Sequence, residues 1–304
     1  MSEISAGLPL LLSDWWQSLS SLLLAPESRT FWGYWLSAAL IVLLWTTTSW
    51  ASRKHYLKPW FTLSYWWNTS TRQEYALIVF NALLFSFLGI SNVFLIIQIA
   101  ISSNAFFSTV FPVTQLGENS VAEMSPVILI SIYAIILFLV DDASRYGLHR
   151  LLHSRWLWRI HRVHHSAQVL TPFTLLRLHP IEQFLYQIRM VTVYGVLSGG
   201  YFSVIGKTPE LWQIFGVGGF IWIFNVAGAN LRHSNIPLRY GKLEVLFISP
   251  AQHQLHHGVG GIHYNYGSVL AIWDYLFNSW HSGEHDLPLP NRHMPLIKQL
   301  LLKR

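Results

Sequence analysis

Residues 126–165 read PVILISIYAIILFLVDDASRYGLHRLLHSRWLWRIHRVHH, in which an uncharged apolar run leads directly into five histidines. An apolar helix of about 20 residues spans the roughly 30 Å hydrocarbon core of a bilayer. The run 126–140 is short for a span, but the helical pattern continues past Asp141. This stretch therefore predicts a membrane helix whose far end carries metal-binding side chains.

The composition of the whole chain agrees with a membrane protein. Of its 304 residues, 52% are hydrophobic and only 11% are charged, against about 25% charged in a typical soluble domain. These values argue against a soluble globular protein and against disorder, and with so few charges the net charge of +6 does not indicate nucleic-acid binding. The absence of cysteine excludes disulfides, thiolate metal sites and a cysteine nucleophile.

Further apolar segments predict additional membrane helices. Residues 31–50 and 75–101 contain no Lys, Arg, Asp or Glu, and residues 184–229 form two more segments separated by the turn-like sequence Gly206-Lys207-Thr208-Pro209. With the helix that begins near residue 126, they predict an all-α integral membrane bundle of about five spans.

The basic residues predict the orientation of this bundle, because short loops rich in Lys and Arg stay in the cytoplasm. Of the 20 basic residues, 17 lie in residues 51–74, 141–183 and 230–304, and residues 102–125 have none. Fourteen of the 15 histidines lie at or after His149. We therefore expect the N-terminus outside and a cytoplasmic helical cap that carries the histidine clusters.

The first cluster lies on one face of a predicted helix. Asp142, Tyr146, His149 and His153 follow steps of four, three and four residues. Two imidazoles four residues apart can bind one metal ion, and a carboxylate beside ligating histidines usually orients them. This stripe predicts two ligands with two supporting side chains.

Two similar three-histidine motifs follow, His161-Arg-Val-His164-His165 and His253-Gln-Leu-His256-His257. The second has clear helix signals, with Ser249 as N-cap, Pro250 in the first turn, Gln252 completing a capping box and Gly258 able to end the helix. We expect a helix of about two turns that carries all three histidines.

For histidines outside these clusters, the sequence gives weaker support for a role as metal ligands. His233 follows the fifth predicted span and is expected to be a further ligand. His179 is either a ligand or the cap of a turn, and His263 is close enough in sequence to the last cluster to compete as a ligand. For histidines in polar loops the ordinary state is solvation, and this applies to His263, His281, His285 and His293.

Eight clustered imidazoles, with His233 as a ninth, exceed what one metal ion binds, so the sequence predicts two metal ions held between helices. All-nitrogen ligation suits iron, zinc or copper. Zinc acts as a Lewis acid or activates water, whereas iron can also bind and reduce dioxygen. Residue chemistry alone leaves this choice open.

As an ordered set, these motifs resemble the sterol desaturase / fatty acid hydroxylase superfamily. The resemblance covers about residues 126–280 and rests on Asp142-x3-Tyr146-x2-His149-x3-His153, His161-x2-His164-His165, His233-Ser234-Asn235 and Ser249-Pro250-x2-His253-x2-His256-His257, followed by Asn265-Tyr266-Gly267.

The resemblance implies an oxygen-dependent, non-haem di-iron enzyme that hydroxylates or desaturates a C–H bond of a lipid. It implies two iron ions as cofactor, O2 as co-substrate, the eight clustered histidines and His233 as ligands, and Asp142 and Tyr146 as groups that orient them. Residues 1–125 would be membrane-anchoring helices, residues 126–280 the di-iron domain, and residues 281–304 a tail on the membrane surface.

The expected partners are the lipid substrate, which enters from the bilayer, and an electron-donor protein. No cysteine is present for an iron–sulfur cluster and no Gly-x-Gly-x-x-Gly unit follows a strand, so we expect the donor to be a separate protein. The membrane would be the inner membrane in a bacterium or the endoplasmic reticulum in a eukaryote.

Two other functions also need imidazoles near a bilayer. A metal transporter or metal-binding membrane protein would carry Asp, Glu or His inside its spans, and the histidines here lie outside them. A zinc-dependent membrane hydrolase would have fewer histidines and a general-base Glu, and the chain has no His-Glu-x-x-His sequence.

Overall fold

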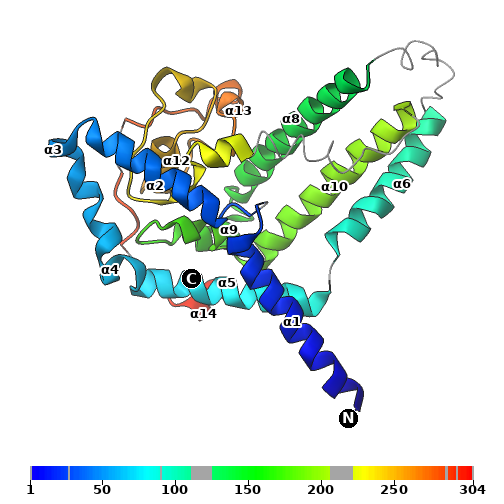
Figure 1. The fold of residues 1–304 in the computed structure, drawn as a ribbon, viewed down its shortest axis with the longest axis horizontal. Coiled ribbons are helices and arrows are strands. Elements are labelled where there is room, and N and C mark those ends of the chain that lie inside the picture. The colour runs from blue at the N-terminus through cyan, green and yellow to red at the C-terminus, as the bar shows by residue number, and fades with distance from the viewer. Residues whose placement is uncertain are drawn as a thin grey trace. The chain divides into compact units, whose positions relative to one another are not determined.

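The computed structural model describes residues 2–26, 28–89, 91–110, 125–205, 222–284, 287–291 and 294–302. Within these ranges the chain is helical, as predicted, and extended pairing is limited to an isolated bridge between Phe247 and Leu270. The long helices are α1 (Ser2–Leu24), α2 (Trp32–Thr47), α5 (Thr69–Leu88), α6 (Asn92–Val110), α8 (Pro126–Leu152) and α10 (Pro180–Ile205) (Figure 1).

Shorter helices connect the long ones and carry most of the histidines. The α-helices among them are α3 (Trp50–Arg53), α4 (Leu63–Trp66), α9 (Trp158–His165), α12 (Pro250–His257), α13 (Ile272–Leu276) and α14 (Leu296–Leu300). The 3-10 helices are η1 (Lys54–Tyr56), η2 (Lys58–Phe61), η4 (Pro172–Leu176), η5 (Ala229–His233) and η6 (Gly241–Val245).

The chain divides into two compact units. The first unit comprises Met1–Ile90, His149–Gln183 and Phe224–Arg304, and the second comprises Ser91–Leu148 and Phe184–Ile223. Three described helices are long and apolar enough to cross a membrane, namely Asn92–Val110, Val127–Leu152 and Pro180–Ile205. Two of these helices contain the central residues of the third and fourth predicted spans.

The predicted single span over residues 75–101 is wrong. Helix α5 begins earlier, because the Asn68 side chain caps it by accepting hydrogen bonds from the backbone of Ser70 and Thr71. It ends at Gly89, which has a left-handed φ of 58°, and α6 begins at Asn92. The break could not be predicted from the apolar run, because a glycine inside an uncharged segment also fits a helix interior.

Two other predicted spans have a different outcome. The expected first span is helix α2, which has 16 residues and is too short to count among the membrane-crossing helices. The hairpin turn at residues 206–209 and most of the fifth predicted span lie outside the described residues.

In the second unit, glycines allow α6 and α10 to approach closely. Gly195 and Gly199 are four residues apart on α10, and a Cβ atom on Gly195 would lie 2.6 Å from the Cβ atom of Ile99. A Cβ atom on Gly199 would lie 2.8 Å from the Cβ atom of Ser103 and would contact the carbonyl oxygen of Ala100. Small residues at this spacing are typical of packed membrane helices, because they bring two backbones together.

In the first unit, α2 packs against the segment that carries His233. Ala38 and Val42 of α2 form a buried cluster with Leu231 and Ile236. Next to this cluster, the Asn235 side chain accepts a hydrogen bond from Trp60 Nε1 at 2.6 Å and donates one to the Tyr56 carbonyl at 2.7 Å. The N-terminal half of the chain thus fixes the position of η5.

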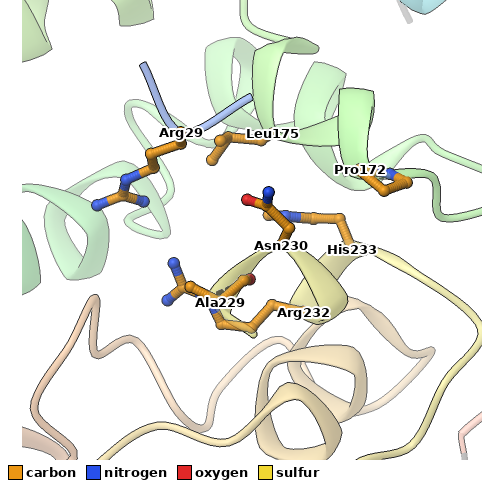
Figure 2. Close-up of a pocket in the computed structure, with 7 residues that line it drawn as sticks. All are labelled: Arg29, Pro172, Leu175, Ala229, Asn230, Arg232 and His233. Carbon is orange, nitrogen blue, oxygen red and sulfur yellow. Dashed lines mark hydrogen bonds between the residues drawn. The ribbon is translucent and has the colours of Figure 1, made fainter. Parts of the chain in front are cut away.

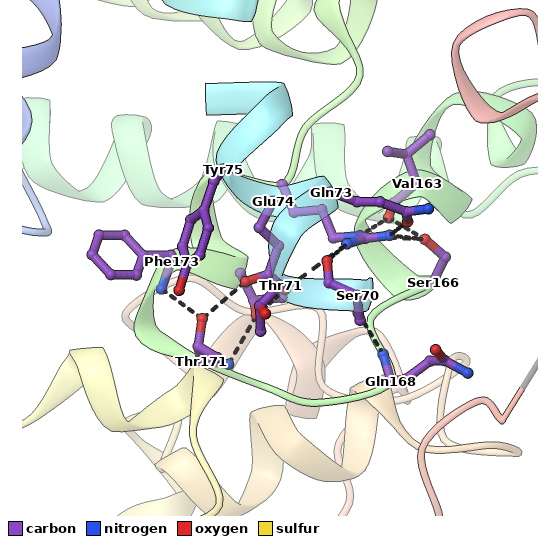
Figure 3. Close-up of polar contacts among 12 residues, drawn as sticks. Ser70, Thr71, Gln73, Glu74, Tyr75, Val163, Ser166, Gln168, Thr171 and Phe173 are labelled. Atoms are coloured by element: carbon purple, nitrogen blue, oxygen red, sulfur yellow. Dashed lines mark hydrogen bonds and ion pairs between the residues drawn. The ribbon is translucent and has the colours of Figure 1, made fainter. Parts of the chain in front are cut away.

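A buried arginine, Arg177, connects α9 to α5 and also donates to the Gln299 side chain of α14 at 3.4 Å. Figure 3 shows the surrounding polar residues of α5 and of the segments at Val163–Ser166 and Thr171. Arg177 is 1% exposed and donates to the carbonyls of Val163 and Ser70, both at 2.8–2.9 Å, and to the side chain of Gln73 at 2.9 Å. Its Nη1 also lies 4.0 Å from Glu74, whose carboxylate accepts hydrogen bonds from Thr171 and Thr174. Burial raises the pKa of Glu74 to about 7.

The space around two glycines predicts opposite effects of alanine substitution on stability. Gly199→Ala forces the helices apart and should lower stability by about 1–3 kcal/mol, as overpacking does. Gly147 on α8 has open space around it, so Gly147→Ala should be neutral or stabilising by up to about 1 kcal/mol. Thermal unfolding in detergent, followed by tryptophan fluorescence, measures both, and equal midpoints for the two variants would contradict the close contact.

The Arg177 cluster predicts a pH-dependent rescue. Arg177→Met leaves the buried Glu74 without its cation and should cost about 3–5 kcal/mol. Adding Glu74→Gln should restore part of that loss at pH 8 and little at pH 5. The folded pKa of Glu74 lies above the unfolded value, so the protonated carboxyl favours folding and stability is lost as the pH rises through about 7. A rescue of the same size at both pH values would show that Glu74 does not titrate in this range.

Candidate metal centre

The structure brings nine histidines of the first unit into two groups. In each group, one ring nitrogen of every member lies within 4.8 Å of the others. The five-histidine group consists of His149, His153, His161, His165 and His256, and the four-histidine group consists of His164, His233, His253 and His257. These are the nine residues that the sequence analysis selected as ligands.

Each three-histidine motif supplies both groups. On α9, His161 and His165 are four residues apart and join the five-histidine group, while His164 faces the four-histidine group. On α12 the assignment is reversed, because His253 and His257 join the four-histidine group and His256 joins the other. The two motifs therefore exchange their middle histidines: in each motif the middle histidine lies in one group and the two outer histidines lie in the other.

The local sequence explains the geometry of α12. The Ser249 side chain accepts a hydrogen bond from Gln252 N, and the Gln252 side chain accepts one from Ser249 N at 3.0 Å. Pro250 occupies the first turn and the helix ends at Gly258. This predicted capping box is confirmed, and it makes a helix of eight residues rigid enough to aim three imidazoles.

The inner ring nitrogens are unusually close to one another. The Nε2 atoms of His149 and His256 are 3.1 Å apart, and His233 Nε2 lies 3.0 Å from His253 Nε2 and 3.1 Å from His257 Nε2. Two nitrogens that each lie about 2.0–2.1 Å from one metal ion, at angles near 90–110°, are separated by about 2.9–3.4 Å. The observed separations fit this geometry.

The proton positions in the five-histidine group also favour a cation. His149 Nδ1 donates to the Tyr266 carbonyl at 2.7 Å, and His256 Nδ1 donates to the Tyr264 carbonyl at 2.6 Å. In a neutral imidazole the other nitrogen then carries only a lone pair. Two lone pairs thus face each other across 3.1 Å, an arrangement that a cation between them would stabilise.

Other ring nitrogens have no hydrogen-bond partner although they are buried. These include His161 Nε2 and both ring nitrogens of His153 and His165. A buried polar atom without a partner costs free energy unless something else satisfies it. Metal ligation satisfies an imidazole nitrogen, so the donor set fits a metal site by this test as well.

The electrostatic environment keeps the imidazoles neutral, which is the form that binds metals. Burial, together with His149 and the positive charge of Arg177, lowers the pKa of His164 to about 3. Burial is also the main cause of the lowered pKa of His153, His161, His165, His233, His253, His256 and His257.

A carboxylate and a loop hold the histidine rings in place. No orienting role is predicted for either of them from the sequence. Glu182 is fully buried, and its Oε1 accepts a hydrogen bond from His161 Nδ1 at 2.8 Å. Hydrogen bonds of this kind fix the tautomer and orientation of a ligating imidazole. From the sequence, this orienting role is predicted for Asp142 and Tyr146, which are both buried on α8 in the second unit. That role stays a prediction.

The loop Tyr264–Gly267 supplies the two carbonyls that accept from His149 and His256. Asp274 holds this loop by accepting from the backbone of Tyr266 and Gly267 at 2.7–2.8 Å, and burial raises its pKa to about 6. Asn265 has a left-handed φ of 56° and donates to the Gln252 carbonyl of α12. Only the Asn265-Tyr266-Gly267 sequence pointed to this loop, and no sequence signal pointed to Asp274.

The other histidines that the structure describes do not join either group. His179 accepts a hydrogen bond from Ile181 N and donates to the Leu300 carbonyl, so both of its ring nitrogens are used where α10 begins. His263 is exposed, and His281 is half-buried and interacts with the Ser282 carbonyl. His285 and His293 lie outside the described residues.

Comparison with known proteins gives a consistent result. A family model described as fatty acid hydroxylase matches residues 134–279. The chain is 30% identical over 148 residues to ornithine lipid hydroxylase OlsE of Rhizobium tropici (47% of this chain, 40% of that protein) and 27% identical over 151 residues to alkylglycerol monooxygenase of Caenorhabditis elegans (49% and 27%).

A further relative is very-long-chain aldehyde decarbonylase GL1-9 of Oryza sativa subsp. indica, which is 30% identical over 166 residues (53% of this chain, 59% of that protein). The matched regions thus span between about a quarter and three fifths of these relatives. No solved structure matches the chain. The predicted resemblance is confirmed, because the fatty acid hydroxylase model matches residues 134–279, which contain both histidine groups.

Proposed function

We propose that this protein is a membrane-bound, O2-dependent oxygenase that uses two iron ions to hydroxylate or desaturate a C–H bond of a lipid. The observation that carries the proposal is the pair of buried, all-nitrogen groups of five and four histidines. In this assignment the nine grouped histidines are the iron ligands, with one ion in each group. When bound, two ferrous ions would supply the reduction of dioxygen that the chain's own residues cannot perform.

The chain's own residues prepare this chemistry in three ways. Burial keeps the imidazoles neutral and water away from the inner nitrogens. Glu182 and the carbonyls of Tyr264 and Tyr266 hold protons on the Nδ1 atoms of three histidines, which leaves Nε2 for the metal. The helices α9 and α12 fix the spacing between the two groups through their exchanged histidines.

The names of the relatives support this class of reaction. Two of them are named as a hydroxylase of ornithine lipid and a monooxygenase of alkylglycerol, and the third as an aldehyde decarbonylase. We infer a lipid substrate that enters from the bilayer and a separate protein that donates electrons. We also infer that the histidine groups lie on the cytoplasmic face, in the inner membrane of a bacterium or the endoplasmic reticulum of a eukaryote.

The size of the ligand sets argues against a zinc hydrolase. A catalytic zinc site usually has three protein ligands and an open position for water. Groups of four and five imidazoles exceed that number.

The proposal predicts iron and oxygen chemistry that depend on His164. Purified wild-type protein should contain about two iron ions per chain and, when reduced, should consume O2 only with a lipid extract present. His164→Ala removes a ligand of the four-histidine group and should lower the iron content to about one ion or none, with loss of lipid-dependent uptake. The exposed His263→Ala is the matched control and should retain both. Two zinc ions and no O2 uptake in the wild type would refute the proposal.

Glu182→Gln tests the orientation of His161. The amide can accept from Nδ1 through its oxygen or donate to it through its nitrogen, so it fixes the tautomer of His161 less firmly, and metal affinity should fall by about 10–100-fold. Competition with a chelator measures this change. Glu284→Gln, at an exposed carboxylate paired with Arg239, provides the control. Unchanged affinity in Glu182→Gln would assign Glu182 a purely structural role.

A further inference from the structure

The two histidine groups differ in how closely they approach the surface of the first unit. Among the nine grouped histidines, His153 is half-buried and the eight others are buried. The four-histidine group is thus enclosed. Around His233, for example, Arg29, Leu175 and Asn230 pack so closely that no water molecule fits between them (Figure 2). The five-histidine group therefore reaches the surface through His153.

Two aromatic rings flank His153 at this point. The ring centre of Trp158 lies 5.2 Å from that of His153 and 5.4 Å from that of His165, and Trp158 is itself half-buried. The ring centre of Tyr266 lies 4.9 Å from that of His153, and the exposed Arg150 lies 6.0 Å from the centre of the Tyr266 ring. Trp158 thus contacts two members of the five-histidine group and also reaches the surface.

A tight turn between α8 and α9 places exposed side chains beside Trp158. In this turn the backbone N–H of Trp158 donates to the Ser154 carbonyl at 2.9 Å. Arg155, Trp156 and Arg159 are exposed there, Trp156 to 74%, and we call these three residues the turn surface. Tryptophan and arginine are enriched in protein interfaces and contribute much of the binding energy there.

The turn surface is positively charged. Among the residues that the structure describes, neither Arg155 nor Arg159 has an ion-pair partner. Residues 143–181, which include the turn, contain no Asp or Glu. Charges of one sign steer the encounter with a partner of the opposite sign and fix its orientation. The turn surface is therefore suited to a protein with an acidic surface.

An anionic membrane surface would also attract arginines and a tryptophan. The position of Trp158 favours a protein that donates electrons. The rate of electron transfer falls steeply with distance, so a donor needs to dock where the candidate metal position lies closest to the surface. A membrane contact has no such requirement, and the turn surface lies beside the half-buried member of the five-histidine group.

We propose that the turn surface is the docking site of the electron-donor protein, and that this donor is a one-electron carrier with an acidic surface. The inference rests on the proposed oxygenase function, because it assigns a docking site to the partner that this function requires. In each encounter the reduced donor loses one electron and a ferric ion in the five-histidine group gains it, and no atom is transferred.

Binding to the full-length protein in nanodiscs of neutral phosphatidylcholine tests the docking. The probe is a plant-type [2Fe–2S] ferredoxin, an acidic one-electron carrier, and cytochrome c is the basic counterpart. Biolayer interferometry measures both dissociation constants. Ferredoxin should bind at low ionic strength and lose most of its affinity in about 1 M salt, because salt screens the charges. Cytochrome c should bind much more weakly or not at all.

A double variant locates the binding site. Arg155→Gln combined with Arg159→Gln should weaken ferredoxin binding by about tenfold or more at low ionic strength. Lys58→Gln combined with Arg72→Gln is the matched control, because it removes the same charge from exposed residues of η2 and α5. The thermal unfolding midpoint shows whether each variant is folded.

Reduction of the iron-loaded ferric protein gives a second readout. Mixed anaerobically with limiting reduced ferredoxin, the Arg155→Gln/Arg159→Gln variant should accept electrons at about a tenth of the wild-type rate or less. Dithionite is a small reductant that needs no docking surface, so it should reduce the variant and the wild type at equal rates. An equal loss of rate with dithionite would assign the two arginines a structural role and overturn the proposal.

A label at Trp156 separates a protein partner from the membrane. The chain has no cysteine, so Trp156→Cys provides a single position for a fluorescent dye. Iodide in the water should quench this dye, and nitroxide-labelled lipids in the nanodisc should not. Strong quenching by the labelled lipids would show that the turn surface contacts the membrane, which would overturn the proposal.

The remaining outcomes separate the docking site from the oxygenase. Equal binding of cytochrome c, no binding of ferredoxin, or unchanged ferredoxin binding in the folded Arg155→Gln/Arg159→Gln variant would refute the docking site. If the same samples contain iron and show lipid-dependent O2 uptake, the oxygenase function stands without it. Ferredoxin binding that depends on the two arginines in a protein without iron or O2 uptake would refute the oxygenase and leave a docking site for an acidic protein.

Discussion

The crowding of imidazole lone pairs is the constraint on which the rest of this structure depends. Inner nitrogens 3.0–3.1 Å apart repel one another in the neutral state unless a proton or a cation lies between them. Three of the elements that carry these histidines are accordingly fixed by further polar contacts. Arg177 fixes α9, the Asn235 contacts fix η5, and the capping box at Ser249 fixes α12. The geometry of the site therefore depends on these surrounding polar contacts as well as on the histidines themselves.

Short-range features of the fold could be predicted from the sequence because a few neighbouring residues determine them. The continuation of α8 past Asp141 and the cap of α12 are local properties, and both are confirmed. The break at Gly89 was missed because an apolar segment tolerates a glycine in either a helix interior or a left-handed cap. The resemblance to the family was carried by histidine spacing, which is also local.

Features that depend on contacts far apart in the chain could not be predicted. The spacing of His161, His164 and His165 separates His164 from the other two, but only tertiary packing decides which histidines it joins. The carbonyls of Tyr264 and Tyr266 orient rings without any side-chain signature. The position of Arg29 beside His233 also emerges only from the fold.

The exchange of middle histidines between α9 and α12 has a consequence for how the proposed centre responds to damage. Each short helix contributes ligands to both groups, so an ion in one group restricts the helix that must also serve the other. A displacement of either helix would therefore disturb both groups at once. Damage to the contacts that hold one short helix should consequently reach both metal positions.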